Sequence, residues 1–236
     1  MHKEEINFEI KPIFCPNEEI CKNFADIDIL CGTLIERNMF YLCRNLDKQY
    51  LDMWKKEKHV FAFAAYYSGQ MVGFTTGFAR GKNMFTNALY VTPEYHGYGI
   101  GTNLLGKSEQ AAGLIASNME LISSDNAISF YQEHGYENTI VFGRVTKTKE
   151  LPKITANVVP VFEWWDKLSL KLNVRMYTDL LKQNKHQPIF VYVNDVQRID
   201  GVAMRLPDGK DFIKCKNYKI KNAVAELLLN ELNNVR

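Results

Sequence analysis

Three glycines, Gly97, Gly99 and Gly101, fall within five residues, just ahead of a long segment with helical spacing. Glycine loses more conformational entropy on folding than any other residue, so such a density is unfavourable unless the backbone itself is used. The segment that follows has small or apolar residues at helical intervals, namely Ile100, Leu104, Leu105, Ser108, Ala111, Ala112 and Ile115. The pattern predicts a loop that presents backbone N–H groups at the start of a helix, an arrangement suited to binding phosphate.

A second phosphate signature overlaps the first. Residues 101–108 fit the P-loop pattern of nucleotide triphosphatases, including Lys107 and Ser108. A P-loop follows a buried strand and keeps its interior out of helix, whereas Leu104 and Leu105 have the spacing of a packed helix face. The glycine spacing and Pro93 also disfavour a dinucleotide-binding loop, while a plain flexible turn is a further alternative.

Hydrophobic periodicity predicts an α/β protein (an α+β fold with a mixed sheet) over the first two thirds of the chain. A hairpin is expected around Ser68 and Gly69, and Pro93 should end the strand before the glycines. The strands are expected at residues 6–13, 60–67, 71–78, 84–91, 120–123 and 139–145. Helices are expected within residues 17–58 and at residues 100–115 and 126–134.

The sequence predicts three segments: a first domain at residues 1–148, a linker or loosely attached strand at 149–160, and a smaller α+β unit at 161–236. In the last segment we expect a helix from 161 to about 183, strands at 189–193, 199–206 and 212–216, and a closing helix. One hypothesis is that this unit is a degenerate half-copy of the first domain, because the predicted hairpins carry Gly73 and Gly201 at the same place.

Two blocks of residues 6–145 resemble the GNAT acetyltransferase superfamily. His96 to Gly101 is similar to the family motif [Q/R]-x-x-G-x-[G/A], with His96 in place of glutamine or arginine. Ala127 to Tyr136 is similar to the family helix A-x-x-x-Y-x-x-x-G-[F/Y]. The resemblance implies a GNAT-like fold and acetyl-CoA as co-substrate. It also implies direct acetyl transfer in a ternary complex to an amine of a small molecule or peptide.

The resemblance also implies which residues hold the coenzyme. The glycine loop would bind the pyrophosphate, the end of the strand before it would splay from its neighbour and bind pantetheine, and Asn126 would contact pantetheine or simply cap its helix. These expected cofactor-binding residues are Leu89, Tyr90, Val91, His96, Gly97, Tyr98, Gly99, Ile100, Gly101, Thr102 and Asn126. Tyr131 is the implied proton donor to the leaving thiolate at the edge of a cleft, and Glu120, with Glu94 as an alternative, is the candidate base.

Composition excludes several other classes of function. The formal net charge of +2 is too small to predict binding to nucleic acid, and the histidines and cysteines lack the spacing of metal ligands. No segment has the length and apolarity of a membrane span, and the N-terminal residues do not resemble a signal peptide, so a cytoplasmic location is expected. A homodimer remains open, and the alternative to an enzyme is a non-catalytic coenzyme A-binding or partner-binding protein.

Overall fold

The computed structural model describes residues 6–14, 16–23, 61–80, 83–121, 123, 125–141, 144–161, 187–216 and 221–235. The first unit contains the strands β1 (Glu9–Pro12), β2 (Phe61–Tyr67), β3 (Gln70–Arg80), β4 (Asn83–Val91), β5 (Asn118–Leu121), β6 (Glu137–Val141) and β7 (Arg144–Glu150). Its helices are α1 (Pro16–Asn23), α4 (Ile100–Gly113) and α5 (Ile128–Glu133). The second unit contains β8 (Val158–Pro160), β9 (Ile189–Val193), β10 (Ile199–Arg205), β11 (Asp211–Cys215) and helix α8 (Lys221–Asn234).

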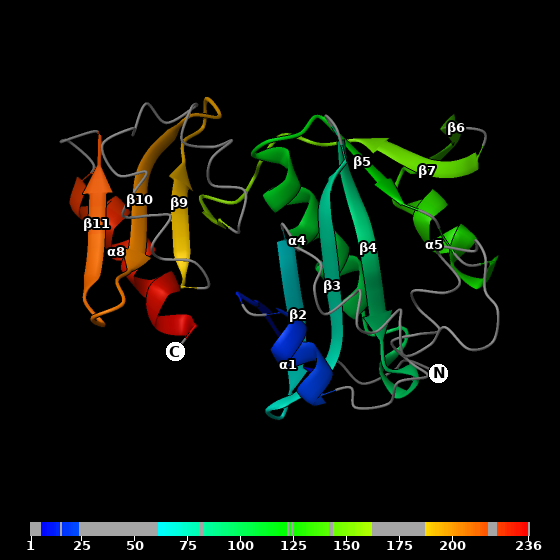
Figure 1. Cartoon of the computed structure of the whole chain (residues 1–236), viewed down its shortest axis with the longest axis horizontal. Coiled ribbons are helices and arrows are strands. Elements are labelled where there is room, and N and C mark those ends of the chain that lie inside the picture. The colour runs from blue at the N-terminus through cyan, green and yellow to red at the C-terminus, as the bar shows by residue number, and fades with distance from the viewer. Residues whose placement is uncertain are drawn as a thin grey trace.

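The first unit is built on a seven-stranded mixed sheet with the order β1-β2-β3-β4-β5-β7-β6 (Figure 1). Neighbouring strands are antiparallel except β4 and β5, which are parallel and are joined through α4. A parallel pair needs such a crossover, because the chain must return to the starting edge of the sheet. The expected α/β fold with a mixed sheet is therefore confirmed.

The core of this unit lies between the sheet and α4. Strand β2 is buried along its first five residues, which explains its uninterrupted apolar sequence. The α4 residues predicted to share a face include Leu104, Leu105, Ala111 and Ala112, and all four are fully buried. Burying one leucine side chain contributes about 1.5–3 kcal/mol to stability, so this face fixes α4 on the sheet.

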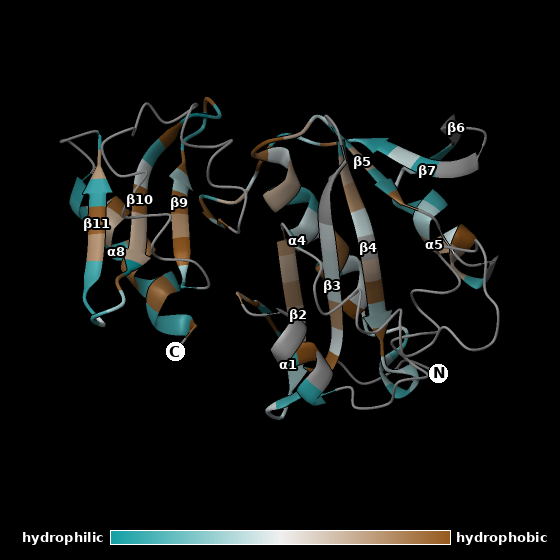
Figure 2. Cartoon of the chain, in the orientation of Figure 1, coloured by the Kyte–Doolittle hydropathy of each residue, from teal (hydrophilic) through white to brown (hydrophobic). Residues whose placement is uncertain are grey.

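The second unit is a four-stranded antiparallel sheet, β11-β10-β9-β8, with α8 packed on one face. Val224, Leu228 and Leu232 form the buried stripe of α8. Figure 2 shows mostly hydrophobic residues along β9 and hydrophobic residues in the middle of β11, which begins with the hydrophilic Asp211. The three strands and the closing helix expected here are confirmed.

Two expectations from the sequence differ from the structure. The single strand expected at 139–145 is wrong, because this region contains the two antiparallel strands β6 and β7. Strand β7 continues to Glu150, past the boundary expected at 148, and the segment expected to be a linker or a loosely attached strand contains β8, which pairs with β9. The helices expected at residues 24–58 and 162–183 lie outside the described residues.

The two units share a strand arrangement. In each, four consecutive antiparallel strands are followed by a helix that packs on the sheet: β1 to β4 with α4, and β8 to β11 with α8. Each hairpin also has a register shift at the residue before its glycine, at Val72 before Gly73 and at Asp200 before Gly201. These correspondences support the half-copy hypothesis.

Candidate functional site

The first feature of the site is a gap between β4 and β5. In the described residues these strands pair at Met84–Met119 and Phe85–Glu120 only. Strand β4 continues to Val91, and a register shift relative to β3 follows Thr86. The outer edge of β4 is therefore not paired with β5 over its C-terminal part.

The pairing of β4 with β3 shows which backbone groups face this gap. The Thr92 amide donates to the Val72 carbonyl at 2.9 Å, which makes the opposed residues Gly73 and Val91 a non-hydrogen-bonded pair. The backbone N–H and C=O of Val91 therefore point away from β3, toward the gap. Because the pattern alternates, those of Leu89 do the same, whereas the Tyr90 backbone points toward β3.

The second feature is the start of α4. Gly97 and Gly99 have φ values of 83° and 79°, a region that glycine enters without strain. The Asn103 amide donates to the Gly99 carbonyl at 3.0 Å. The amides of Ile100, Gly101 and Thr102 precede it in the first turn, so they have no acceptor within the helix, and the helix dipole places partial positive charge there.

The overlapping P-loop interpretation is wrong. Residues 101–108 lie wholly within α4, and from Asn103 onward their amides donate to helix carbonyls, so this segment does not form a loop that wraps a phosphate. The Ser108 hydroxyl is fully buried and donates to the Leu104 carbonyl at 2.9 Å. The preceding residue, Lys107, is exposed.

His96 binds the end of β4. Its Nε2 lies 2.7 Å from the Val91 carbonyl oxygen, and since a carbonyl only accepts, Nε2 carries the hydrogen and donates it. The exposed imidazole thereby connects the glycine loop to the strand that it follows. This contact accounts for a histidine at the position where the family motif has glutamine or arginine.

A second histidine, missed in the sequence, joins α5 to the first turn of α4. The Nδ1 atom of His134 is 2.7 Å from the Phe130 carbonyl and therefore donates to it. In the neutral ring Nε2 is then an acceptor, and it lies 3.1 Å from the Thr102 hydroxyl, which donates. The one available signal was that His134 falls inside the second motif and Thr102 directly after the first.

Tyr131 is buried within α5 instead of lying at the edge of an open cleft. Its side chain is 2% exposed, and its ring makes edge contacts with Phe130 and Tyr136 at centroid distances of 5.1 and 5.6 Å. Next to it, the Tyr136 hydroxyl donates to Glu109, and burial and this carboxylate raise the pKa of Tyr136. The Lys149 ammonium binds both Glu109 oxygens at 2.9 Å.

Glu120 stands where the pairing of β4 and β5 ends. Its side chain is 4% exposed and accepts a hydrogen bond from the Asn83 amide. Asn126 is exposed in a short 3₁₀ turn, and the N-cap position of α5 is Ala127. A capping role for Asn126 is therefore wrong, and its predicted contact with pantetheine stays a prediction. Glu94 is exposed at the loop mouth.

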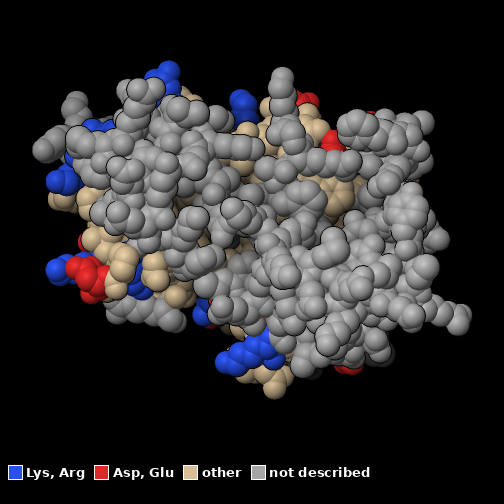
Figure 3. Space-filling view, viewed as in Figure 1, with Lys and Arg blue, Asp and Glu red and all other residues tan. Residues whose placement is uncertain are grey.

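Three further properties of the described residues bear on the nature of the site. Within the described part of the chain, no group of three or more His, Cys, Asp or Glu side chains is arranged to hold a metal ion. None of the described helices combines the length and apolarity needed to cross a membrane. In the described part of the face in Figure 3, basic and acidic side chains are scattered along the margins without a continuous basic surface.

Comparison with known proteins identifies the first unit. Residues 57–138, which include the glycine loop and the whole of α4 and α5, match the family model described as acetyltransferase (GNAT) domain. These residues form a GNAT domain. The match ends before β7, so it says nothing of the second unit. No curated protein sequence matches the chain.

Solved structures similar to this chain include other acetyltransferases. The PaiA N-acetyltransferase of Thermoplasma acidophilum, in complex with coenzyme A, is 14% identical, with 61% of this chain and 99% of that chain covered and a TM-score of 0.45. The N-acetylglutamate synthase of Neisseria gonorrhoeae, complexed with coenzyme A and N-acetyl-glutamate, is 17% identical, with coverage of 63% and 36% and a TM-score of 0.43. At such identities and TM-scores, their ligands and reactions say nothing about this chain.

Proposed function

We propose that the GNAT domain is an acetyl-CoA-dependent N-acetyltransferase acting on an amine of a small molecule or peptide. The observation that carries this proposal is the junction of β4 and α4. There, amides in the first turn of α4 follow directly after a strand whose Val91 backbone groups point away from β3, toward the gap. Helix N-terminal amides bind a phosphate, and the backbone groups of a strand edge bind an extended amide chain. A ligand that has both groups needs these donors next to each other.

In this proposal the amides from Gly97 to Thr102 hold the pyrophosphate of acetyl-CoA. Pantetheine lies in the gap and hydrogen-bonds to the outward backbone of Val91. The Val91 carbonyl already accepts from His96, so the Val91 N–H is the donor left facing the gap, where it can stabilise charge on the thioester oxygen. His96 thus positions the loop, and the backbone binds the coenzyme.

Acetyl transfer then needs two proton transfers. The neutral amine nitrogen of the acceptor forms a bond to the acetyl carbon while the carbon–sulfur bond breaks. The proton leaving nitrogen passes to Glu120, directly or through water, and the departing thiolate takes a proton from the Tyr131 hydroxyl. Burial of both side chains excludes bulk water, which strengthens such interactions.

The test combines binding with turnover. Acetyl-CoA should raise the melting temperature, whereas ATP with magnesium should not, because only a ligand of the native state stabilises it. With pooled primary amines, free coenzyme A should appear in step with N-acetylated product detected by mass spectrometry. Stabilisation without turnover would favour the non-catalytic coenzyme A-binding alternative, and stabilisation by ATP alone would contradict both.

A further inference from the structure

Helix α5 packs against the first turn of α4 through two side chains. A Cβ on Gly101 would lie 3.5 Å from the Phe130 ring, and the Nε2 atom of His134 lies 3.1 Å from the Thr102 hydroxyl. The rings of Phe130 and His134 lie against each other, with centroids 4.5 Å apart. The imidazole of His134 is therefore held beside the amides that, in the proposed function, bind the pyrophosphate of acetyl-CoA.

The Thr102 hydroxyl lies close to those amides. The Cα–Cβ bonds of an α-helix tilt toward its N-terminus, so a side chain in the first turn lies next to the amides that have no acceptor within the helix. The series of helix hydrogen bonds begins with the Asn103 amide, which places Thr102 at the end of this free stretch. An exposed hydroxyl at this position can donate to a bound anion if its hydrogen is not already used.

In the structure that hydrogen is used by His134. Because Nδ1 of His134 donates to the Phe130 carbonyl at 2.7 Å, Nε2 of the neutral ring accepts from the Thr102 hydroxyl. Protonation of Nε2 reverses this hydrogen bond, since an imidazolium ring donates from both nitrogens. The Thr102 oxygen then accepts from His134, and its own hydrogen becomes available to a phosphate oxygen, with a positive charge directly behind it.

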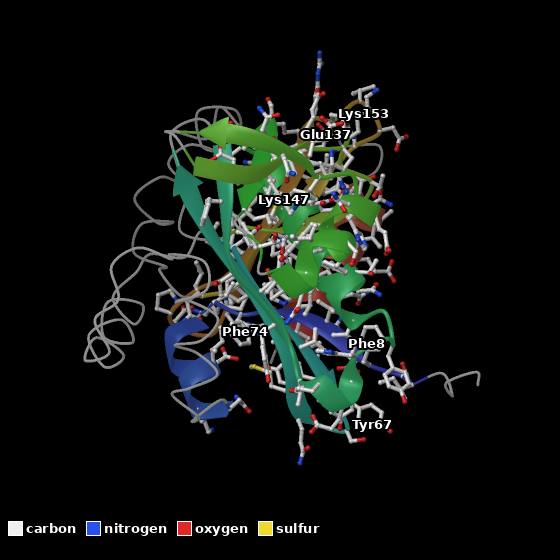
Figure 4. All side chains as sticks on the ribbon, turned by 90° about the vertical axis from the view of Figure 1, so that its right-hand side faces the viewer. Phe8, Tyr67, Phe74, Glu137, Lys147 and Lys153 are labelled. Atoms are coloured by element: carbon white, nitrogen blue, oxygen red, sulfur yellow. The ribbon has the colours of Figure 1, made fainter. Side chains whose placement is uncertain are left out.

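The charged side chains on the neighbouring elements are paired or exposed. Lys149 of β7 binds both oxygens of Glu109 on α4. Lys147, which Figure 4 shows on the same strand, is buried and donates to an asparagine of β6 at 2.9 Å. Glu133, the neighbour of His134 in α5, is exposed. Imidazole is the side chain that ordinarily titrates near neutral pH, so a proton taken up beside the loop resides on His134 or on His96.

We propose that His134 is a positioning residue for the coenzyme: it takes up a proton when the pyrophosphate binds and thereby turns the Thr102 hydroxyl toward a phosphate oxygen. This inference rests on the proposed function, because it needs the pyrophosphate at the first turn of α4. The proton comes from solvent, is held on Nε2, and returns to solvent when the coenzyme leaves. Since binding and proton uptake are linked, the coenzyme should bind roughly fivefold more tightly at pH 6 than at pH 8.

The probe is acetyl-dephospho-coenzyme A, which keeps the pyrophosphate but lacks the phosphate monoester of coenzyme A, a group that itself titrates near neutral pH. Calorimetric titration of the full chain at pH 7, in buffers with different ionisation enthalpies, gives the number of protons taken up for each ligand bound. We expect uptake of a fraction of one proton. Binding without proton uptake would overturn this inference and leave the proposed function standing, whereas absence of binding would overturn both.

Variants identify the group that holds the proton. His134→Gln keeps an acceptor for Thr102 but cannot be protonated near neutral pH, so the proton uptake and the pH dependence of binding should both be lost. His96→Gln is the matched control, because it removes the other imidazole beside the loop and should leave the uptake in place. Uptake that persists in His134→Gln, or that disappears in His96→Gln, would contradict the assignment.

A second pair of variants tests the role of the hydroxyl. Thr102→Val removes the hydroxyl at nearly constant shape and should lose most of the proton uptake, whereas Thr102→Ser keeps the hydroxyl and should retain it. Uptake in Thr102→Val equal to that of wild type would show that the imidazolium acts on the phosphate without the hydroxyl, which would overturn the proposed role of Thr102. Melting curves without ligand identify any variant that fails to fold, and the wild-type titration tests the proton uptake without any variant.

Discussion

The β4–α4 and β11–α8 segments are built alike but are joined differently. In both, the helix packs on the face of the sheet toward which a Cβ on the corresponding glycine, Gly73 or Gly201, would point. A Cβ on Gly201 would lie 2.9 Å from Val224 of α8, and a Cβ on Gly73 would lie 3.3 Å from the Val91 side chain, which also approaches Gly101 of α4. Strand order, hairpin register shift and helix face therefore agree between the units.

The difference lies in the connection from strand to helix. Residues 92–99 join β4 to α4 and include Gly97 and Gly99 at positive φ, whereas residues 216–220, which join β11 to α8, contain no glycine. Since α8 packs on its sheet without such a loop, packing alone does not require the glycines of the first unit. Their entropic cost points instead to a role for the exposed backbone.

The largest expected effect comes from altering that loop. Gly99→Val should abolish the rise in melting temperature caused by acetyl-CoA, because valine is strained at φ 79° and the loop must rearrange. Gly209→Val is the matched control: Gly209 has φ 82° in the turn before β11, so the strain is similar but far from the loop in sequence. Thermal shift with and without acetyl-CoA measures both. Equal loss in the two variants would indicate a general folding defect.

The next effect concerns chemistry in the first unit alone. Tyr131→Phe should lower the acetylation rate by about 10²–10⁴-fold while retaining the thermal shift with acetyl-CoA, because the ring is kept and only the proton donor is lost. Tyr192→Phe in β9 should change neither. Steady-state rates and melting curves provide the comparison. A wild-type rate for Tyr131→Phe would show that the proton comes from another donor.

A smaller effect tests whether Gly73 and Gly201 have the same structural role in the two units. Gly201→Ala should destabilise the protein by about 1–3 kcal/mol, since the new methyl group would press on Val224 and Leu228 of α8. Acetyl-CoA binding should persist. Gly73→Ala, whose methyl group would lie 2.8 Å from the Tyr90 carbonyl, should disturb β4 and weaken acetyl-CoA binding as well. Chemical denaturation and calorimetry would separate the two. If both variants lost acetyl-CoA binding equally, the units would not be independent.

The smallest effect is expected from Lys107→Ala. Lys107 is exposed in the middle of α4, so acetyl-CoA binding and stability should stay close to wild type. The measurement is the same thermal shift. A large loss of the thermal shift caused by acetyl-CoA would indicate that this lysine does bind phosphate.

Sequence reasoning located elements where local pattern and tertiary packing agree. The apolar run of β2, the strand at residues 189–193 and the buried face of α4 all follow from periodicity. It left the segment of β8 open between a linker and a loosely attached strand, because a three-residue edge strand that ends in a proline carries little strand signal. It also merged β6 and β7 into one strand, because the apolar pattern does not show that the chain turns back between them.

Only the parts of the candidate site that lie within the two sequence motifs could be predicted. The glycine positions gave the loop and the helix start, but the contacts of His96 with Val91 and of His134 with Thr102 join residues from different elements. Such contacts depend on how the elements pack. The burial of Tyr131 likewise depends on ring contacts with Phe130 and Tyr136. The spacing of residues in the sequence does not predict these contacts.

The early end of β4–β5 pairing has a thermodynamic consequence for any ligand in the gap. Beyond Phe85 no described residue of β4 pairs with β5, so an incoming molecule breaks no sheet hydrogen bond between the described parts of these strands. At Val91 it exchanges water for an outward amide, and this exchange is nearly neutral in hydrogen-bond number. The affinity is then governed by the loss of the ligand's own freedom, and a rigid analogue of pantetheine should bind more tightly than a flexible one.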